Sequence, residues 1–397
     1  MLRIVATADN HLGRYYDRMP PARLEERRRY LRRCFSTTVD LALERQAHLF
    51  LQLGDLFDTP EPRNAERLFV AQALSRLREG GVRTFAIGGN HDTARTHTSA
   101  SASSPQTAYV PLGGLHLLEP AGPDGAVPFA AVECGGLRVA IGGLGWDPTL
   151  GPGADPLAAA RVEPPAAAVR LLLAHYCLDQ QPYSGALEPV VARATLDAIE
   201  GIDHFLFGHI HRHRRLDLGR DPGDRTATMV GATERMTFGA EEGEPGFVYL
   251  EIGADARLAR FEFVPTPSQP RREVTIAAAE LGADPTEAVL SRLAEIAAPD
   301  CLVKLRLAGV VTREVYHRLD PRRILEVGAE RCFHLDLETD GLLLEGDLAR
   351  QSGGGIRFSP TEELRRCADE ALALAADDPE RELIQEARDL ALERYAR

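Results

Sequence analysis

The sequence predicts an α/β protein in which two β-sheets are layered between helices, an α-β-β-α sandwich. Two observations predict this fold. Short apolar strand candidates alternate with helical stretches over the first 265 residues, and the second half of that region is richer in strands. Several strand candidates are continuous apolar runs, as expected of strands that are covered on both faces.

The predicted strands of this region are short and are separated by helical or polar stretches. They are Leu2–Ala8, His48–Leu53, Thr84–Ile87, Leu137–Ile141, Leu171–Ala174, His204–Phe207, Thr226–Val230, Phe247–Glu251 and Arg260–Val264. Two amphipathic helices lie between the first three strands. Pro21–Ala47 has apolar residues at helical spacing, and Arg63–Gly80 ends in a pair of glycines.

A proline-rich connector, Val264–Arg272, separates this region from a smaller α/β unit. That unit is expected to contain the strands Glu273–Ile276, Cys301–Leu307 and Phe333–Leu337 and a helix over Pro285–Ala297. A second break, Gln351–Pro360, precedes a helical tail formed by Thr361–Ala376 and Pro379–Arg397. One further segment, Thr93–Ser104, is rich in Ala, Ser and Thr and predicts a surface loop.

Net charge, cysteine spacing and hydropathy argue against several classes of function. The formal net charge of −13 argues against bulk electrostatic attraction to nucleic acid, although a local basic groove remains compatible with it. The six cysteines are scattered without a CxxC pair, so neither a zinc ribbon nor a disulfide framework is expected. No apolar run approaches the roughly 20 residues needed to cross a bilayer, and the N-terminus does not read as a signal peptide. The expectation is a cytoplasmic protein with no membrane contact.

Five short polar motifs follow predicted strands, at the ends where α/β folds build their sites. They are Asp9-Asn10-His11, Gly54-Asp55-Leu56-Phe57-Asp58, Gly89-Asn90-His91-Asp92, His175 and Gly208-His209-Ile210-His211. Each motif alone is weak evidence. Because all five occur in this order and each follows a strand, they indicate one shared site.

The residue types in these motifs are metal ligands. Carboxylate oxygen, amide oxygen and imidazole nitrogen without a thiolate suit manganese, iron or zinc better than calcium. The D-x-H and H-x-H spacings put both members of each pair on one side of an extended segment, where they can face one ion or two neighbouring ions. Glycines before Asp55, Asn90 and His209 permit tight turns and close backbone approach. The motifs therefore predict a metal centre at the ends of these strands.

These motifs resemble the signature of the calcineurin-type metallophosphoesterases. More narrowly, the first 265 residues resemble SbcD-type exonucleases of DNA double-strand-break repair, relatives of the Mre nucleases, through ATADNHLGR, LGDLFDTPEPRN, DHFLFGHIHRH and GATERMTFG. Residues 270–345 resemble that family's capping domain through less specific motifs. The resemblance implies a nuclease domain over residues 1–268, a DNA-binding capping domain over 269–350 and a partner-binding tail over 351–397.

The resemblance also implies two divalent metal ions per chain, with manganese as the expected metal. The implied ligands of the first ion are Asp9, His11, Asp55 and His211. Those of the second are Asp55, Asn90, His175 and His209, so that Asp55 bridges the ions.

Three further side chains are implied to support catalysis. His91 would be the imidazole that stabilises the transition state or protonates the leaving sugar oxygen, and Asp92 would orient it. Asp58 stands where archaeal and eukaryotic relatives tend to carry histidine, which favours the bacterial branch. Either a supporting catalytic role or a loop-capping role fits Asp58.

The resemblance implies DNA as substrate, and Arg14, Arg212 and His213 are the candidate substrate-binding residues. For Arg14, phosphate contact and plain surface charge are equally compatible with the sequence. The run Arg27-Arg28-Arg29, with Arg32 and Arg33, is expected to be a solvated helix face, with phosphate contact as the alternative.

The implied partners are an SMC-like ATPase of SbcC type, bound by the C-terminal helices, and a second copy of the chain. The homodimer would use apolar residues of the helix Arg63–Gly80, expected to be exposed at Leu68, Ala71, Leu74 and Val70. Packing of that helix against its own sheet explains the same pattern.

The leading hypothesis is therefore a manganese-dependent DNA nuclease with 3′-to-5′ exonuclease and single-strand endonuclease activity. The first alternative is a phosphoesterase for small nucleotides or phosphoproteins; the Thr59-Pro60 pair after Asp58 argues against the protein-phosphatase signature. The second alternative is a regulatory scaffold that docks an ATPase, against which the full ligand set argues.

Overall fold

The computed structural model describes residues 1–16, 19–93, 104–118, 125–179, 188–238, 243–345, 368, 371–372 and 378–395. Within it the chain forms two compact units. The first comprises Met1–Val274, Leu293–Leu305 and Leu325–Asp336, and the second comprises Thr275–Arg292, Arg306–Ile324 and Leu337–Arg397. Most of the expected loop Thr93–Ser104 and most of the expected helix Thr361–Ala376 lie outside the described residues.

The first unit contains two six-stranded sheets. In the first sheet the strand order is β14-β13-β1-β2-β3-β4, and β1 to β4 run parallel to one another. Its strands are β1 (Leu2–Thr7), β2 (Leu49–Leu53), β3 (Arg83–Ile87), β4 (His116–Leu117), β13 (Gly246–Ile252) and β14 (Leu258–Pro265). Strand β13 pairs antiparallel with β1, Leu2 opposite Ile252.

The second sheet has the order β11-β12-β10-β7-β6-β5, with β12, β10, β7 and β6 parallel. Its strands are β5 (Phe129–Cys134), β6 (Leu137–Leu144), β7 (Val169–His175), β10 (His204–Gly208), β11 (Arg214–Asp217) and β12 (Thr226–Met229). A separate short pair, β8 (Cys177–Leu178) and β9 (Val190–Val191), follows β7 along the chain.

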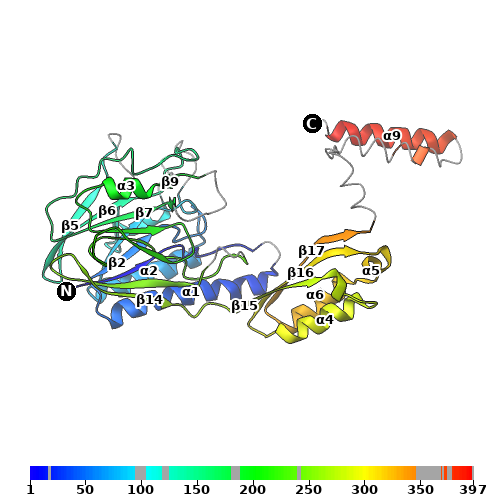
Figure 1. The fold of residues 1–397 in the computed structure, drawn as a ribbon, viewed down its shortest axis with the longest axis horizontal. Coiled ribbons are helices and arrows are strands. Elements are labelled where there is room, and N and C mark those ends of the chain that lie inside the picture. The colour runs from blue at the N-terminus through cyan, green and yellow to red at the C-terminus, as the bar shows by residue number, and fades with distance from the viewer. Residues whose placement is uncertain are drawn as a thin grey trace. The chain divides into compact units, whose positions relative to one another are not determined.

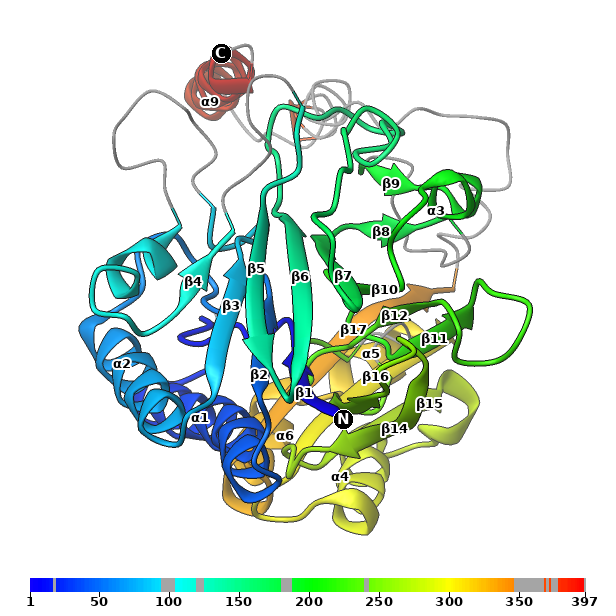
Figure 2. The same cartoon turned by 90° about the vertical axis from the view of Figure 1, so that its left-hand side faces the viewer.

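Alternate side chains of each strand bury different layers, because successive residues of a strand point to opposite faces. On β1, Leu2, Ile4 and Ala6 pack between the two sheets, whereas Val5 packs under the helices. Helices α1 (Pro21–Glu44) and α2 (Asn64–Glu79) cover the outer face of the first sheet (Figure 2). The outer face of the second sheet packs on residues around α3 (Arg193–Ala198). The predicted α-β-β-α sandwich is confirmed.

Helix α1 corrects the expectation of a solvated arginine face at Arg27, whereas Arg29 is exposed as expected. Arg27 is fully buried and forms a 3.0 Å ion pair with Glu234, which is also fully buried. Its guanidinium also donates to Gln269 Oε1 at 3.0 Å. An arginine in an otherwise polar helix pattern gives no sign of burial, because the sequence does not reveal which distant carboxylate faces it.

Helix α2 corrects the expected dimer surface. Val70 and Leu74 are buried in the core of the first unit, whereas Leu68 is 60% exposed. The apolar periodicity of α2 is therefore explained by packing against its own sheet, the alternative that the sequence left open.

The proline-rich connector between β14 and β15 (Arg271–Ala277) is anchored to the first unit. The Gln269 backbone amide donates to Glu234 Oε2 at 2.8 Å, and the Thr266 hydroxyl donates to the Thr233 carbonyl at 2.6 Å. Gln269 is fully buried. The connector is thus a packed segment, and its prolines fix its path.

The smaller α/β region has a three-stranded sheet of order β15-β16-β17, with helices α4, α5 and α6 (Figure 1). The remaining bounds are α4 (Pro285–Ile296), β16 (Leu302–Val311), α5 (Arg313–Arg318), α6 (Pro321–Arg331), β17 (His334–Leu344) and, in the tail, α9 (Asp378–Tyr395). Helices α5 and α6 were not expected, because α5 is short and α6 is rich in charged residues. None of the helices in the described ranges has the length and apolar character that crossing a membrane requires.

Candidate metal centre

The five predicted motifs meet at one edge of the sandwich. Strands β1, β2 and β3 are parallel within the first sheet, and β7 and β10 are parallel within the second, so each set of carboxyl ends lies at a common edge. Direct contacts join the two sets: the His209 backbone amide donates to Asp9 Oδ1 at 2.9 Å, and His175 Nδ1 lies 2.7 Å from the Leu53 carbonyl. Loops far apart in the sequence therefore share one site.

The first cluster of ligand atoms comes from Asp9, His11 and His211. One potential donor atom of each lies within 4.8 Å of those of the others. The Nε2 atoms of His11 and His211 face each other at 3.3 Å. Two imidazole nitrogens that approach in this way, beside a buried carboxylate, suit a shared cation.

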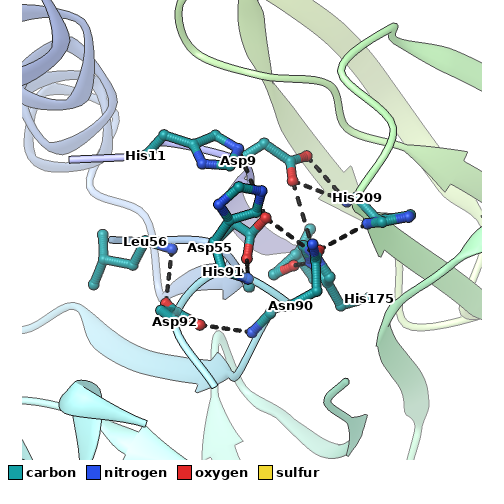
Figure 3. Close-up of polar contacts among 12 residues, drawn as sticks. Asp9, His11, Asp55, Leu56, Asn90, His91, Asp92, His175 and His209 are labelled. Carbon is teal, nitrogen blue, oxygen red and sulfur yellow. Dashed lines mark hydrogen bonds and ion pairs between the residues drawn. The ribbon is translucent and has the colours of Figure 1, made fainter. Parts of the chain in front are cut away.

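The second cluster surrounds Asn90 (Figure 3). Asn90 Oδ1 lies 2.9 Å from His209 Nδ1 and 3.1 Å from His175 Nε2. Between the clusters, Asp55 Oδ2 lies 3.6 Å from His11 Nε2 and 3.5 Å from His175 Nε2. Asp55 is thus the carboxylate placed to serve both clusters.

The charged and polar groups of the centre shift one another's pKa values. Burial opposes ionisation of Asp55, but the neighbouring His175 and His11 rings outweigh it and hold the pKa of Asp55 well below its usual range. Burial lowers the pKa of His11, which keeps a ring lone pair available. For His175, burial acts in the same direction, but the carboxylates of Asp55 and Asp9 raise its pKa to about 9.

Backbone strain is concentrated at the same residues. Six non-glycine residues in the described ranges have positive φ, and four of these belong to the centre. Those four are Asp9 (49°), His11 (45°), Asp55 (51°) and His209 (86°). A left-handed conformation costs of order 1–3 kcal/mol per residue and persists where the surrounding structure imposes it, commonly at functional sites.

Two of the predicted glycines are required by close contacts. A Cβ atom on Gly54 would lie 2.2 Å from His175 Nδ1, and Gly54 also has φ of 89°. A Cβ atom on Gly89 would lie 2.2 Å from Asp55 Oδ1. The loops after β2 and β3 can therefore reach the centre only with glycine at these positions.

Asp58 contacts His11, a proposed ligand, at the Nδ1 atom of its ring. Its Oδ1 accepts from His11 Nδ1 at 3.0 Å and from the Arg14 guanidinium at 2.8 Å. Burial opposes ionisation, but the hydrogen bond from His11 and the charge of Arg14 lower the pKa of Asp58. This arrangement directs His11 Nε2 toward the first cluster.

The structure corrects the role expected of Asp92. Its carboxylate accepts from the backbone amides of Gly89 at 2.7 Å and Leu56 at 3.0 Å and from Gln106 Nε2 at 3.1 Å, and it does not bond His91 (Figure 3). Asp92 therefore ties the loops after β2 and β3 together. The reason is local geometry: the loop after β3 turns the Asp92 side chain inward while His91 faces the centre. Burial and the charge of Asp55 raise the pKa of Asp92 to about 7.

His91 stands beside the first cluster, and its side chain is 39% exposed. The ring contacts His11 edge-on at 4.6 Å between centroids. Its Nδ1 lies 3.6 Å from Asp58 Oδ1 and 3.4 Å from the Asp58 carbonyl. The neighbouring carboxylate of His91 is thus Asp58, where the sequence had indicated Asp92.

The three candidate substrate-binding residues differ in their exposure and in the contacts that they make. Arg14 is held by Asp58, and Arg212 is exposed. His213 is half-buried, stacks on Phe263 at 4.6 Å between centroids and bonds the Met229 carbonyl. Contacts of these three residues with substrate remain predictions.

Two residues near the second cluster were missed by sequence reasoning. Glu188 Oε2 lies 2.8 Å from His209 Nε2, and the Trp146 ring stacks on the His209 ring at 5.4 Å between centroids. Neither residue lies in a motif. The only signal for Glu188 is a carboxylate before the short apolar segment Val190–Val191, which is too common to single it out.

The donor set fits two divalent cations. Each cluster combines imidazole nitrogen with carboxylate or amide oxygen, and Asp55 stands between them. Such mixed nitrogen and oxygen ligands suit first-row transition metals.

Comparison with known proteins places this centre in a family. Residues 2–213 match the model of the calcineurin-like phosphoesterase family. The chain is 27% identical over 260 residues to the DNA double-strand break repair protein Mre11 of Sulfurisphaera tokodaii, which covers 65% of this chain and 59% of that protein. It is 24% identical over 265 residues to the Mre11 protein of Saccharolobus solfataricus, covering 66% of this chain and 61% of that protein.

A shorter match of higher identity, 36% over 93 residues, links 23% of the chain to 14% of the Mre11 protein of Methanosarcina acetivorans. The matches span about three fifths of the two longer-matching relatives. The similarity to double-strand-break repair proteins of the Mre type, expected from the motifs, is confirmed. Because the family model covers all five motifs of the candidate centre, from β1 to the residues after β10, the chain belongs to the calcineurin-like phosphoesterase family.

Proposed function

We propose that this protein is a dinuclear-metal DNA nuclease that processes DNA ends in double-strand-break repair. The observation that carries the proposal is the convergence of seven donor side chains on two clusters that share Asp55. DNA as the substrate is supported by the relatives, which are double-strand break repair proteins. Exonuclease action from the 3′ end and single-strand endonuclease action are proposed on the same ground.

The proposed ligands divide between the clusters. Asp9, His11 and His211 would hold the first ion, and Asn90, His175 and His209 the second, with Asp55 bridging. Two bound cations would polarise the phosphoryl oxygens and activate the attacking water. Manganese is the proposed metal, because the ligands are oxygen and nitrogen with no thiolate.

His91 is the proposed catalytic imidazole. Asp58 lies on the Nδ1 side of the ring, and no described residue bonds Nε2. Nε2 is therefore the atom placed to stabilise the transition state or to protonate the leaving sugar oxygen. Asp58 would hold both His11 and His91 in position.

The test compares linear duplex DNA with a small phosphodiester, bis(p-nitrophenyl) phosphate, in the presence of Mn²⁺. The wild-type protein is expected to degrade DNA only with the metal. His91→Ala should lower the rate by about 10²–10⁴-fold, the usual contribution of general acid–base catalysis, while calorimetry still detects both bound ions.

The alternatives predict different results. Turnover of small nucleotides or phosphoproteins with no action on DNA would favour the small-substrate phosphoesterase. Absence of any hydrolysis in a metal-loaded protein that binds an ATPase would favour the docking scaffold.

Two partners belong to the same proposal. Leu383 on α9 is 66% exposed and would contribute to docking an SMC-like ATPase of SbcC type, and Leu68 on α2 would contribute to a homodimer. Sedimentation of the chain with and without that ATPase measures both associations. Leu383→Glu should weaken binding of the ATPase, and Leu68→Glu should weaken the homodimer.

A further inference from the structure

His209 makes contacts through both of its ring nitrogens, on opposite sides of the ring. Its Nδ1 faces the second cluster, 2.9 Å from Asn90 Oδ1. Its Nε2 faces away from that cluster and lies 2.8 Å from Glu188 Oε2. The two nitrogens therefore have different environments: metal-ligand atoms at one and a carboxylate outside the ligand set at the other.

The carboxylate determines which nitrogen carries the hydrogen. A neutral imidazole has one N–H donor and one lone pair, and a carboxylate only accepts. Asn90 Oδ1 is also an acceptor, but a carboxylate accepts a hydrogen bond more strongly than a neutral amide oxygen does. The contact with Glu188 therefore places the hydrogen on Nε2 and leaves the Nδ1 lone pair on the side of the second cluster. Hydrogen bonds of this kind fix the tautomer and orientation of metal-binding histidines.

Glu188 is itself held in place by the short strand pair that follows β7. Cys177 of β8 is paired with Val190 of β9, which brings the thiol beside Glu188. The Cys177 Sγ lies 3.6 Å from Glu188 Oε2, and the Glu188 carbonyl accepts from the Gly153 amide at 3.0 Å. The thiol contact and the backbone hydrogen bond thus hold Glu188 beside His209.

A second contact holds the plane of the His209 ring. Trp146 stacks on it at 5.4 Å between centroids with an interplanar angle of 30°, and Trp146 in turn stacks on Tyr176 at 5.3 Å. The Tyr176 hydroxyl donates to the Gly145 carbonyl at 2.9 Å. The Trp146 indole therefore limits rotation of the His209 ring, whose Nε2 atom contacts Glu188.

We propose that Glu188 is a positioning residue, which holds His209 in the tautomer and orientation that present Nδ1 to the second metal ion. The proposal rests on the dinuclear centre proposed above. Cys177, Glu188 and His209 also lie close enough together to suggest a separate ion. A single Nε2 atom cannot both donate to Glu188 and bind such an ion, and the observed 2.8 Å contact favours donation.

The test is a titration of the metal-stripped full-length protein with Mn²⁺. Calorimetry gives the number of sites and their Kd values. Fluorescence follows the second site directly, because Trp146 is the only tryptophan in the chain and stacks on His209. Glu188→Gln and Glu188→Met are matched variants, since both side chains fill similar space but only glutamine keeps an acceptor.

The wild-type protein should bind two ions. Glu188→Met should weaken one of them by about 10–100-fold, the usual cost of losing such a partner, and leave the other unchanged. In Glu188→Gln the Kd of that site should lie between the values for the wild type and for Glu188→Met. The ¹⁵N shifts of His209 should show an Nε2–H tautomer in the wild type and a mixture in Glu188→Met. Glu163→Gln, at an exposed glutamate paired with Arg161, is the control and should match the wild type.

The outcomes separate the two proposals. If the wild type does not bind two ions, the dinuclear centre fails and the role of Glu188 fails with it. If the wild type binds two ions and Glu188→Met binds both as tightly, only the role of Glu188 is overturned. A third ion that is lost in Glu188→Met, with the other two unchanged, would also overturn it by making Glu188 a ligand.

Discussion

At the scale of single residues, the candidate centre depends on glycines that leave space for the ligands as much as on the ligands themselves. The loop after β3 holds Asp55 through the His91 backbone amide, which donates to Asp55 Oδ1 at 2.8 Å. Gly89 lies against the same carboxylate and leaves room for it only because it has no side chain. Ligand geometry therefore depends on a residue that contributes no ligand.

Gly89→Ala should displace Asp55, because the new Cβ would lie 2.2 Å from Oδ1 and 2.3 Å from the Asp55 amide nitrogen. We expect Mn²⁺ binding, measured by calorimetry, to weaken at least tenfold, and the free energy of unfolding to fall by about 1–3 kcal/mol, as for other overpacked sites. Gly151→Ala is the matched control, since a Cβ atom at that position would have no atom of the described residues within 4 Å. Equal Mn²⁺ affinities for the two variants would contradict this account.

Sequence reasoning located the proposed ligands, because each follows a strand in a short motif of metal-binding residue types. It misplaced Asp92, whose carboxylate bonds loop amides. It also missed Glu188, because only the fold brings this carboxylate, which lies 21 positions before His209 in the sequence, beside the His209 ring. Residues that act through another side chain leave no pattern at short range in the sequence.

At the scale of elements, α1 is anchored by a buried ion pair. Arg27 and Glu234 are both fully buried at 3.0 Å, and Glu234 also accepts the Gln269 amide from the connector. A charge buried without its partner costs several kcal/mol, so this pair makes helix, loop and connector depend on one another.

Glu234→Gln should therefore lower the free energy of unfolding by about 3–5 kcal/mol, because it leaves the Arg27 charge buried without its partner. The double variant Arg27→Met with Glu234→Leu should recover part of that loss, because it removes the unpaired charge but leaves the Gln269 amide without its acceptor. Urea denaturation followed by circular dichroism measures both. The exposed pair Arg23 and Glu26 provides the control: Arg23→Met should cost no more than about 1 kcal/mol.

The strands and long helices were predictable because their apolar periodicity is strong, and β1, β2, β3, β7 and β10 lie within a few residues of expectation. Short or polar elements were not predictable from the sequence. Strand β11 is mostly charged, β4 has two residues, and α6 carries several charges. These elements form because neighbouring strands and tertiary contacts stabilise them, and local sequence preference contributes little.

At the scale of the whole first unit, the centre joins two sheets. Asp9 and Asp55 follow strands of the first sheet, whereas His175 ends β7 and His209 follows β10 in the second. Ions bound between them would link the sheets in the folded state only, since the unfolded chain does not bring these ligands together.

Adding Mn²⁺ to the metal-free protein should therefore raise the thermal unfolding midpoint. At a free metal concentration of 100 times Kd, one site contributes about 2.7 kcal/mol. Differential scanning calorimetry across a Mn²⁺ series measures the shift. Asp55→Ala should abolish most of it, and a shift of the same size in that variant would argue against the shared carboxylate.

The pairing of β1 with β13 has a consequence for synthesis on the ribosome. Leu2 lies opposite Ile252, so the antiparallel neighbour of β1 emerges about 250 residues after β1 itself. At roughly 5–20 residues per second, that interval lasts on the order of 12–50 s. During this time the nascent chain can pair β1 with β2 but leaves the other edge of β1 open to solvent and to neighbouring chains. The topology therefore leaves one edge of the mostly apolar strand β1 without its neighbour until nearly two thirds of the chain has been made.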